Sequence, residues 1–355
     1  MQPSRPRAPV TIRLWPLLMG LLLVATPACS PTRTDTEETG AAPEEPAADP
    51  AEGSTQTGSL EDRVTRRLEA LDARTSLYAK HLPTGREIAL RADVPMNTLS
   101  VIKVPIMARA FLDHAEGEMD LDSRVEVTPE DMRRGSGLLQ TFAPGLEPTL
   151  RDLVTQMIIT SDNTATDMVI RAVGMERVNA LLEERGYDQT RLKLTTGDLF
   201  LETWTRTDPA LDSMSHRTVY ERGFPSDEGA GPRFFELEGD STVWLGRTTA
   251  REMGRFLEEI HDAALAPEDA SQEMLAILGQ QFYTTRLPRR VRFQGVNVAH
   301  KTGDWPPYAG NDVGILFYEG GPTIISVFTN QNRGDFFELE DTLGRIAEDI
   351  VSAWK

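Results

Sequence analysis

Three short motifs in this 355-residue chain combine alcohols and amines, the groups that nucleophilic acyl transfer needs. They are Ser100-x-x-Lys103, Ser161-Asp162-Asn163 and Lys301-Thr302-Gly303, in that order along the chain. A serine hydroxyl is a weak nucleophile at neutral pH and needs a base within about 3 Å. A lysine can be that base if its pKa falls. The motifs therefore predict a site at which Ser100 attacks a carbonyl group and Lys103 takes its proton.

The first motif fits the start of a helix. Lys103 then lies one turn after Ser100 on the same face, so that its amine can reach the hydroxyl. Pro105 fits only if that helix has barely begun, because an interior proline loses a backbone hydrogen bond. Free amides at a helix N-terminus also suit an oxyanion. Burial and a second cation such as Lys301 would both lower the pKa of Lys103.

Each of the other two motifs also has a purely structural interpretation. Ser161 could pass a proton to a leaving nitrogen and Asn163 could hold a substrate carbonyl, yet Ser, Asp and Asn are also favoured helix N-caps. Lys301 and Thr302 offer a charge and a hydroxyl to a carboxylate, and Gly303 lets a substrate approach the backbone. The same tripeptide could simply end a strand. All three motifs together, in this order, favour the chemical interpretation.

The set S-x-x-K, S-D-N and K-T-G resembles that of class A β-lactamases and related penicillin-recognising serine hydrolases. Residues 89–107, 149–167 and 311–329 read like the corresponding stretches of that family, so the resemblance covers most of residues 60–355. It implies that Ser100 is the acylated nucleophile and Lys103 its base partner.

The resemblance also assigns the remaining site residues. It makes Ser161 the proton shuttle and Asn163 a contact to the substrate amide. It implies that Lys301 and Thr302 bind the substrate carboxylate and that the substrate lies against the backbone at Gly303. The backbone amides of Ser100 and Asp304 would form the oxyanion hole, although the family usually has a small neutral residue at the position of Asp304. The implied substrate is a β-lactam or a D-Ala-D-Ala-type peptide, with no cofactor and no metal.

The family's deacylation machinery is missing from its expected position. Class A enzymes activate the deacylating water with a glutamate, which an asparagine follows a few residues later. Aligning residues 190–192 with that loop puts Thr196 at the glutamate position and Phe200 at the asparagine position. Asp198 and Glu202 are near but out of register, and Asp198 is either a replacement base or a solvated loop carboxylate. Acylation is therefore expected, and turnover stays open.

Three functions share this site: a β-lactamase, a D,D-peptidase or penicillin-binding enzyme that lactams trap, and a binding lipoprotein without turnover. A metal hydrolase is disfavoured because the five histidines show no ligand pair, and a Ser-His-Asp hydrolase because no G-x-S-x-G occurs. Arg286 and Arg289 could assist with a substrate carboxylate, but ordinary surface arginines are the favoured interpretation.

The elements that must position the motifs predict an α/β protein of the α+β type. Apolar spacing and turn residues define the expected elements: a helix from Leu60, a hairpin at 76–82 and 87–92, helices at 150–160, 163–184, 250–264, 272–279 and 336–354, and strands at 292–301, 312–318 and 323–329. We expect a β-lactamase-like antiparallel sheet lobe from both chain ends (60–98 and 247–355) with an inserted helical lobe (99–246).

The N-terminal residues predict export. Three arginines precede an apolar run too short to span a membrane, and the run ends at Cys29, the chain's single cysteine. Cys29 resembles a lipidated lipobox cysteine, which makes residues 1–29 a lipoprotein signal, although Thr26 departs from that pattern and leaves ordinary cleavage after Ala28 open. Residues 30–59 have the composition of a disordered tether.

The folded part is acidic. Removing the charge of residues 1–29 (+3) and 30–60 (-6) from the total of -18 leaves -15 on residues 61–355. Such a surface repels nucleic acid and anionic lipid, so we expect no nucleic-acid partner and attachment to a membrane only through the lipid on Cys29. We expect a monomer in the periplasm or at the cell surface.

Overall fold

The computed structural model describes residues 58–355. Cys29, the predicted signal and nearly all of the predicted tether therefore lie outside the described residues. Within 58–355, no helix combines the length and the apolar character that crossing a membrane requires.

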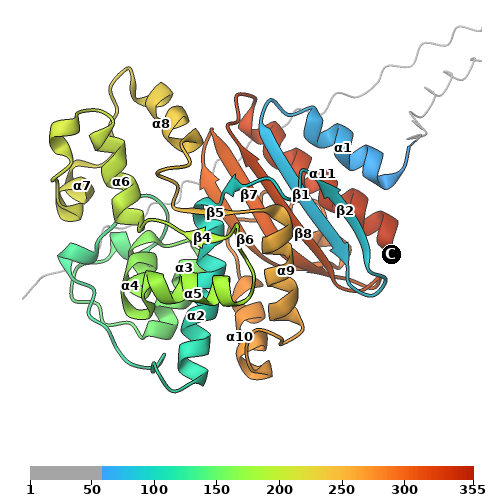
Figure 1. Cartoon of the computed structure of the whole chain (residues 1–355), viewed down its shortest axis with the longest axis horizontal. Coiled ribbons are helices and arrows are strands. Elements are labelled where there is room, and N and C mark those ends of the chain that lie inside the picture. Colours follow the sequence, from blue (N-terminus) through green and yellow to red (C-terminus); the bar gives the residue numbers. More distant parts are fainter. Residues whose placement is uncertain (1–57) are drawn as a thin grey trace, which may run out of the picture. The chain divides into compact units, whose positions relative to one another are not determined.

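The central sheet has five antiparallel strands in the order β2-β1-β8-β7-β6 (Figure 1). Its strands are β1 (Arg74–His81), β2 (Arg86–Leu90), β6 (Asn297–Trp305), β7 (Ala309–Phe317) and β8 (Thr323–Asn330). Strand β1 pairs with β8 over its whole length, with Leu77 opposite Val327. This pairing joins the two ends of the folded chain in one sheet and leaves β6, which carries the Lys301 motif, at an edge.

Both faces of this sheet are buried, and each face is covered by helices. Helices α1 (Leu60–Glu69) and α11 (Phe336–Trp354) share a buried apolar cluster with Leu77 and Ala79 of β1. Helix α9 (Ala250–His261) packs on the opposite face, where Gly254 comes so close to Tyr78 that a Cβ would lie 2.5 Å from its ring. The sheet is therefore a rigid support for the residues at the β6 edge.

The helical region is built around α2 (Lys103–Ala115), most of which is buried. It is surrounded by α3 (Leu150–Ile159), α4 (Asn163–Val173), α5 (Met175–Glu184) and α10 (Glu268–Leu278). The sequence predicted one helix over 163–184, but Gly174, with φ +82°, ends α4 and begins α5. A residue with a side chain would be strained in that conformation.

A small second sheet separates the helical region from an insertion. It has the order β3-β5-β4, with β3 at Met96–Asn97, β4 at Arg191–Leu192 and β5 at Gly246–Thr248. Between β4 and β5 the chain forms α6 (Thr196–Thr205), a 3-10 turn (Pro209–Leu211), α7 (His216–Arg222) and α8 (Ala230–Gly239). These helices lie together at one end of the molecule in Figure 1. None of these helices is among the elements that the sequence predicted.

Four more short 3-10 helices complete the described chain, at Leu99–Ile102, Pro129–Asp131, Leu139–Thr141 and Arg292–Gln294. The last of these corrects a boundary, because the strand expected from residue 292 begins only at Asn297. Gly295 has a left-handed backbone, φ +77°, and ends the 3-10 turn before β6 starts. The first 3-10 helix, Leu99–Ile102, carries Ser100.

Candidate active site

Ser100 lies on a 3-10 turn that runs directly into α2, so that Lys103 is the first residue of the α-helix. Ser100 is partly exposed, whereas Lys103 is fully buried. Strand β6 presses against this turn at Gly303, where a Cβ would lie 2.5 Å from the carbonyl oxygen of Thr98. Only glycine allows the Lys301 motif to approach the nucleophile so closely.

The amine of Lys103 is bonded to the second motif. Its Nζ lies 2.7 Å from the carbonyl oxygen of Ser161, 3.2 Å from Ser161 Oγ and 2.9 Å from Asn163 Oδ1. An ammonium group would donate three hydrogen bonds here, and a neutral amine would donate two and keep a lone pair. The arrangement therefore suits either protonation state, as a group that takes and returns a proton must.

Ser161 connects the two lysines. Its Oγ lies 3.1 Å from Nζ of Lys301, which also donates to the carbonyl oxygen of Thr302 at 2.8 Å. Ser161 has φ +56°, a strained backbone for a residue with a side chain. The next residue, Asp162, holds this conformation by capping α4 through Ala165 N (2.9 Å) and by accepting from Leu139 N (2.7 Å).

Burial shifts both lysines toward the neutral form. Burial, followed by the charge of Lys301, lowers the pKa of Lys103 well below its usual range. Burial also lowers the pKa of Lys301 to about 7, against the opposing charges of Asp304 and Asp312. A buried lysine with a lowered pKa can accept a proton at neutral pH, as a general base must.

The predicted residues thus fall into one cluster, with differences in detail. Lys103, Ser161 and Lys301 are directly hydrogen-bonded, and Ser100 lies one turn before Lys103, although its hydroxyl has no hydrogen bond within residues 58–355. Asn163 is buried and already engaged, since its Nδ2 donates to the carbonyl oxygen of Arg134 at 3.0 Å. The structure places Asn163 as a support for Lys103.

Thr302 and Asp304 follow Lys301 on the edge strand β6. The Thr302 hydroxyl is buried and has no hydrogen-bond partner in the described part of the chain. The Asp304 carboxylate pairs with Nη2 of Arg286. Because successive strand residues point to opposite faces, Thr302 and Asp304 share a face of β6 and Lys301 lies on the other.

Thr196 and Asp198, the residues of the predicted deacylation loop, are both hydrogen-bonded to neighbouring side chains. Thr196 is buried, and its hydroxyl lies 2.7 Å from Asp167 Oδ1 and 3.2 Å from the carbonyl oxygen of Asn163. Asp198 completes the capping box of α6 by accepting from Thr195 N at 3.2 Å; it also accepts from Thr195 Oγ1 at 2.7 Å, and its other oxygen lies 3.0 Å from His216 Nε2. Its hydrogen bond to His216, more than any other cause, lowers its pKa to about 2.

Two groups near the site were missed or misread in the sequence. Arg286 is 2% exposed, so its interpretation as a surface arginine was wrong. Asp167 accepts hydrogen bonds from Arg133 Nε (2.7 Å) and from the amides of Thr196 (2.7 Å) and Gly197 (2.9 Å), and so ties the start of α6 to α4. Thr195-x-x-Asp198, a capping-box pattern, was the one available signal that a helix begins here.

Comparison with known proteins agrees with this geometry. A family model described as "Beta-lactamase enzyme family" matches residues 59–354. A β-lactamase of Streptomyces lavendulae is 26% identical over 303 residues, which are 82% of this chain and 86% of that protein. Other similar proteins include β-lactamases named ROB-1, such as that of Haemophilus influenzae, 25% identical over 50% of this chain and 57% of its own.

Solved structures share the fold. A β-lactamase from Sphaerobacter thermophilus has a TM-score of 0.66 and 24% identity, covering 83% of this chain and 96% of its own. A single-site mutant of PBP-A, solved as an acyl-enzyme complex with penicillin G, has a TM-score of 0.66 and 19% identity with the same coverage. The fold is that of class A β-lactamases. The chain belongs to the β-lactamase enzyme family and is a β-lactamase-like serine hydrolase.

Proposed function

We propose that β-lactam amides acylate Ser100 and that the acyl-enzyme is then hydrolysed slowly. One observation carries the proposal of acylation. Ser161 Oγ lies within hydrogen-bonding distance of both Lys103 (3.2 Å) and Lys301 (3.1 Å), and Lys103 lies one turn after Ser100. This arrangement offers a base to the attacking hydroxyl and a proton donor to the leaving nitrogen.

The acylation step follows from these contacts. Lys103, as the neutral amine, takes the proton of Ser100 while Oγ attacks the lactam carbonyl carbon. The amides of Ser100 and Asp304 stabilise the resulting oxyanion. When the carbon–nitrogen bond breaks, Ser161 gives its proton to the nitrogen and regains one from Lys103. The product is an ester of Ser100, with the lactam ring opened and no atom lost.

The proposal that the acyl-enzyme is hydrolysed slowly rests on the carboxylates near α6. Hydrolysis of the ester needs a base that activates water, and a base works best when its pKa is near the working pH. Asp198 has a pKa of about 2 and is bonded to Thr195 and His216. Asp167 accepts four hydrogen bonds from Arg133, Thr196 and Gly197. Asp198 is 45% exposed but a weak base at so low a pKa, and Asp167 is buried with both oxygens engaged, so water attacks the ester with little assistance.

Time-resolved mass spectrometry of the intact protein, mixed with benzylpenicillin, tests this function. We expect the mass to rise by that of the whole lactam and the adduct to persist, with only slow colour from a chromogenic cephalosporin. Ser100→Ala should give no adduct, whereas Ser241→Ala, at an exposed serine, should react as the native protein does. Rapid colour without a lasting adduct would show efficient turnover, and no adduct at all would show a binding protein.

The lack of an available base favours a second candidate, a D,D-peptidase or penicillin-binding enzyme that β-lactams trap. Its acyl-enzyme would form from a D-Ala-D-Ala-type peptide with release of D-alanine, by the same proton transfers. Release of D-alanine from such a peptide, abolished by Ser100→Ala and by prior treatment with penicillin, would support it. Retained lactam adducts without any release of D-alanine would exclude it.

We also propose that the protein is exported and held at a membrane by a lipid on Cys29, on the basis of the sequence alone. Cells grown with a labelled fatty acid should label the native chain and leave Cys29→Ser unlabelled. Labelling of both variants, or of neither, would contradict the anchor and leave the proposed chemistry at Ser100 untouched.

A further inference from the structure

The residues around Lys301 include a buried guanidinium that is already hydrogen-bonded through all three of its nitrogens. Arg286 is 2% exposed, and its Nη1 donates to the carbonyl oxygen of Asn311 at 2.7 Å. Nε and Nη2 each lie 3.3 Å from Glu340 Oε1, and Nη2 also pairs with Asp304. Only the Asp304 carboxylate, which is 28% exposed, extends from this group toward solvent.

Among the charged side chains around Arg286 and Lys301, acids match or outnumber bases. Lys301 and Arg286 are the bases, and Asp304, Asp312 and Glu340 are acids that act on one or both of them. Because the pKa of Lys301 is about 7, roughly half of the molecules at neutral pH carry no charge there. A free carboxylate entering beside Lys301 therefore finds one buried arginine that is already neutralised and a lysine that is only partly charged.

Two polar side chains on one face of β6 remain to meet a ligand: the partly exposed Asp304 carboxylate, a hydrogen-bond acceptor, and the buried Thr302 hydroxyl. Asp304 follows Thr302 by two residues on β6, so both side chains lie on one face of the edge strand. The Thr302 hydroxyl is fully buried and has no partner within residues 58–355. A buried polar atom without a partner is costly unless a ligand completes its hydrogen bond.

The position of Asp304 relative to the nucleophile makes its charge relevant to the reaction. Its negative charge reaches both Lys103 and Tyr283, because it acts to raise the pKa of each of these groups. Tyr283 in turn lies against the second motif, with its hydroxyl 3.4 Å from the carbonyl oxygen of Thr160. Asp304 also follows Gly303, the residue through which β6 presses on the turn that carries Ser100, and its backbone amide is the one assigned to the oxyanion hole.

We propose that Asp304 makes this site prefer acyl donors with a neutral or positively charged group over donors with a free carboxylate on the leaving-group side of the scissile amide. The inference rests on the proposed acyl transfer at Ser100 and names its substrate class. An incoming carboxylate is repelled by Asp304 and cannot displace it from Arg286, which is locked by Glu340 and Asn311. An amide N–H or an ammonium group instead donates to Asp304.

The favoured natural donor is accordingly a peptide that continues as an amide beyond the leaving group, or whose terminal carboxylate is masked. Lys301 keeps its proton-donating contact with Ser161 (3.1 Å) for any such donor. Its role here differs from the carboxylate binding that the sequence implied for Lys301 and Thr302, because Asp304 already supplies the negative charge.

The test compares benzylpenicillin with its methyl ester, which differ in charge at this group and share the scissile amide. The second-order rate constant for adduct formation is measured by mass spectrometry on the full chain. We expect the ester to acylate the native protein at least as fast as the acid. Asp304→Asn, which keeps the backbone amide, should raise the acid-to-ester rate ratio about tenfold, because it removes a like charge.

Asp188→Asn is the matched control, since Asp188 is exposed, in the segment before β4 and outside the hydrogen-bonded groups of the site, and its ratio should equal the native one. The native ratio is informative even if Asp304→Asn fails to fold. An acid that reacts faster than the ester, or a ratio that Asp304→Asn leaves unchanged, overturns the selection by Asp304 while acylation of Ser100 stands. No adduct from either probe overturns the proposed function, and this inference with it.

Discussion

The charged groups on the two sides of the nucleophile are all hydrogen-bonded, but to different kinds of partner. On the side of β6, Lys103 and Lys301 meet at one hydroxyl, Ser161 Oγ, whose proton can move toward either amine. On the side of α6, Asp167 and Asp198 accept from backbone amides, hydroxyls, Arg133 and His216. The first arrangement exchanges protons, and the second holds a helix in place.

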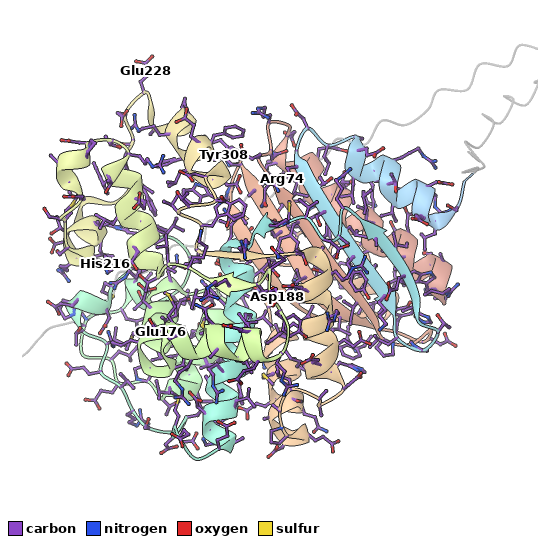
Figure 2. All side chains as sticks on the ribbon, viewed as in Figure 1. Arg74, Glu176, Asp188, His216, Glu228 and Tyr308 are labelled. Atoms are coloured by element: carbon purple, nitrogen blue, oxygen red, sulfur yellow. The ribbon has the colours of Figure 1, made fainter. Side chains whose placement is uncertain are left out.

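This contrast teaches that a carboxylate near an active site is an effective base only if its pKa is near the working pH and an oxygen can reach water. The insertion that begins at α6 is instead fastened by Asp167 of α4 and by its own Asp198. Gly197 shows how tight this attachment is, because a Cβ there would lie 2.6 Å from His216 Nδ1 and 2.7 Å from Arg133 Nε. At the far end of the insertion, Phe235 of α8 packs edge-on against Tyr308, in the turn after β6 (Figure 2). The insertion thus contacts the segments that flank the site.

The largest effect on the reaction is expected from replacing Lys103, the base on the β6 side. Lys103→Met keeps the length and apolar stem of the side chain and removes the proton acceptor. We expect the acylation rate constant to fall by about 10²–10⁴-fold, the usual contribution of a general base. Time-resolved mass spectrometry with benzylpenicillin measures it.

Lys80→Met is the matched control for Lys103→Met. Lys80 forms a partly exposed ion pair with Glu258 at 2.6 Å, and such pairs contribute only about 0–1 kcal/mol. Its acylation rate should stay near the native value. Acylation by Lys103→Met at a rate within a few-fold of native would show that another group takes the proton of Ser100.

Removing one charge on the α6 side should weaken the fold more than the chemistry. Asp167→Asn leaves Arg133 buried without its carboxylate and puts an NH₂ group against donors at Thr196 and Gly197. Breaking a buried ion pair in this way costs about 3–5 kcal/mol of the free energy of unfolding. Urea unfolding measures the loss, with Asp212→Asn, at an exposed aspartate, as the control. A loss below about 1 kcal/mol would mean that Asp167 does not hold α6.

The β6 side could be predicted from the sequence because its geometry is local or strand-like. Ser100 and Lys103 are one turn apart, and Lys301 ends up beside them because β6 pairs with β7 and presses on the turn through Gly303. Periodicity also placed α11 with its buried face correctly, as Leu343 and Ile346 show. In each case, spacing along the chain determines which side chains share a face.

The α6 side could not be predicted in the same way because its contacts are tertiary. Asp198 is three residues from Thr195, which signals a cap, but nothing in the spacing places His216 beside it. Arg286 looked like a surface residue because its partners, Asp304 and Glu340, are 18 and 54 positions away. Long charged side chains are usually exposed, so only their partners reveal that they are buried.

Introducing a carboxylate that can activate water should let the α6 side take part in the reaction, as the β6 side does. Thr196→Glu places an acid at the loop position beside Asn163, to whose carbonyl oxygen Thr196 Oγ1 now lies at 3.2 Å. We expect deacylation to accelerate about tenfold, below the full range for a general base, because the new side chain must disrupt the contact with Asp167. Loss of the penicillin adduct over time measures the rate.

Thr196→Gln is the control for Thr196→Glu, because it has the same size and cannot act as a base. It should deacylate as slowly as the native protein. Equal acceleration in both variants would trace the effect to a loosened loop that admits water. No acceleration in either would mean that the water approaches the ester from another side.

The smallest effect is expected at Asp198. The result at this residue is also the one that could most readily contradict the comparison. Its pKa is lowered to about 2, so the ionised form is favoured in the folded state. Its contribution to stability is therefore complete above the usual pKa of about 4 and is lost as the pH falls toward 2. Asp198→Asn should lower the free energy of unfolding by about 1 kcal/mol or less at pH 6, a value typical of weakened capping, with a smaller difference at pH 3.

Deacylation at pH 7 should not change. A tenfold slower deacylation in this variant would make Asp198 the water-activating base, because capping alone would not affect that rate.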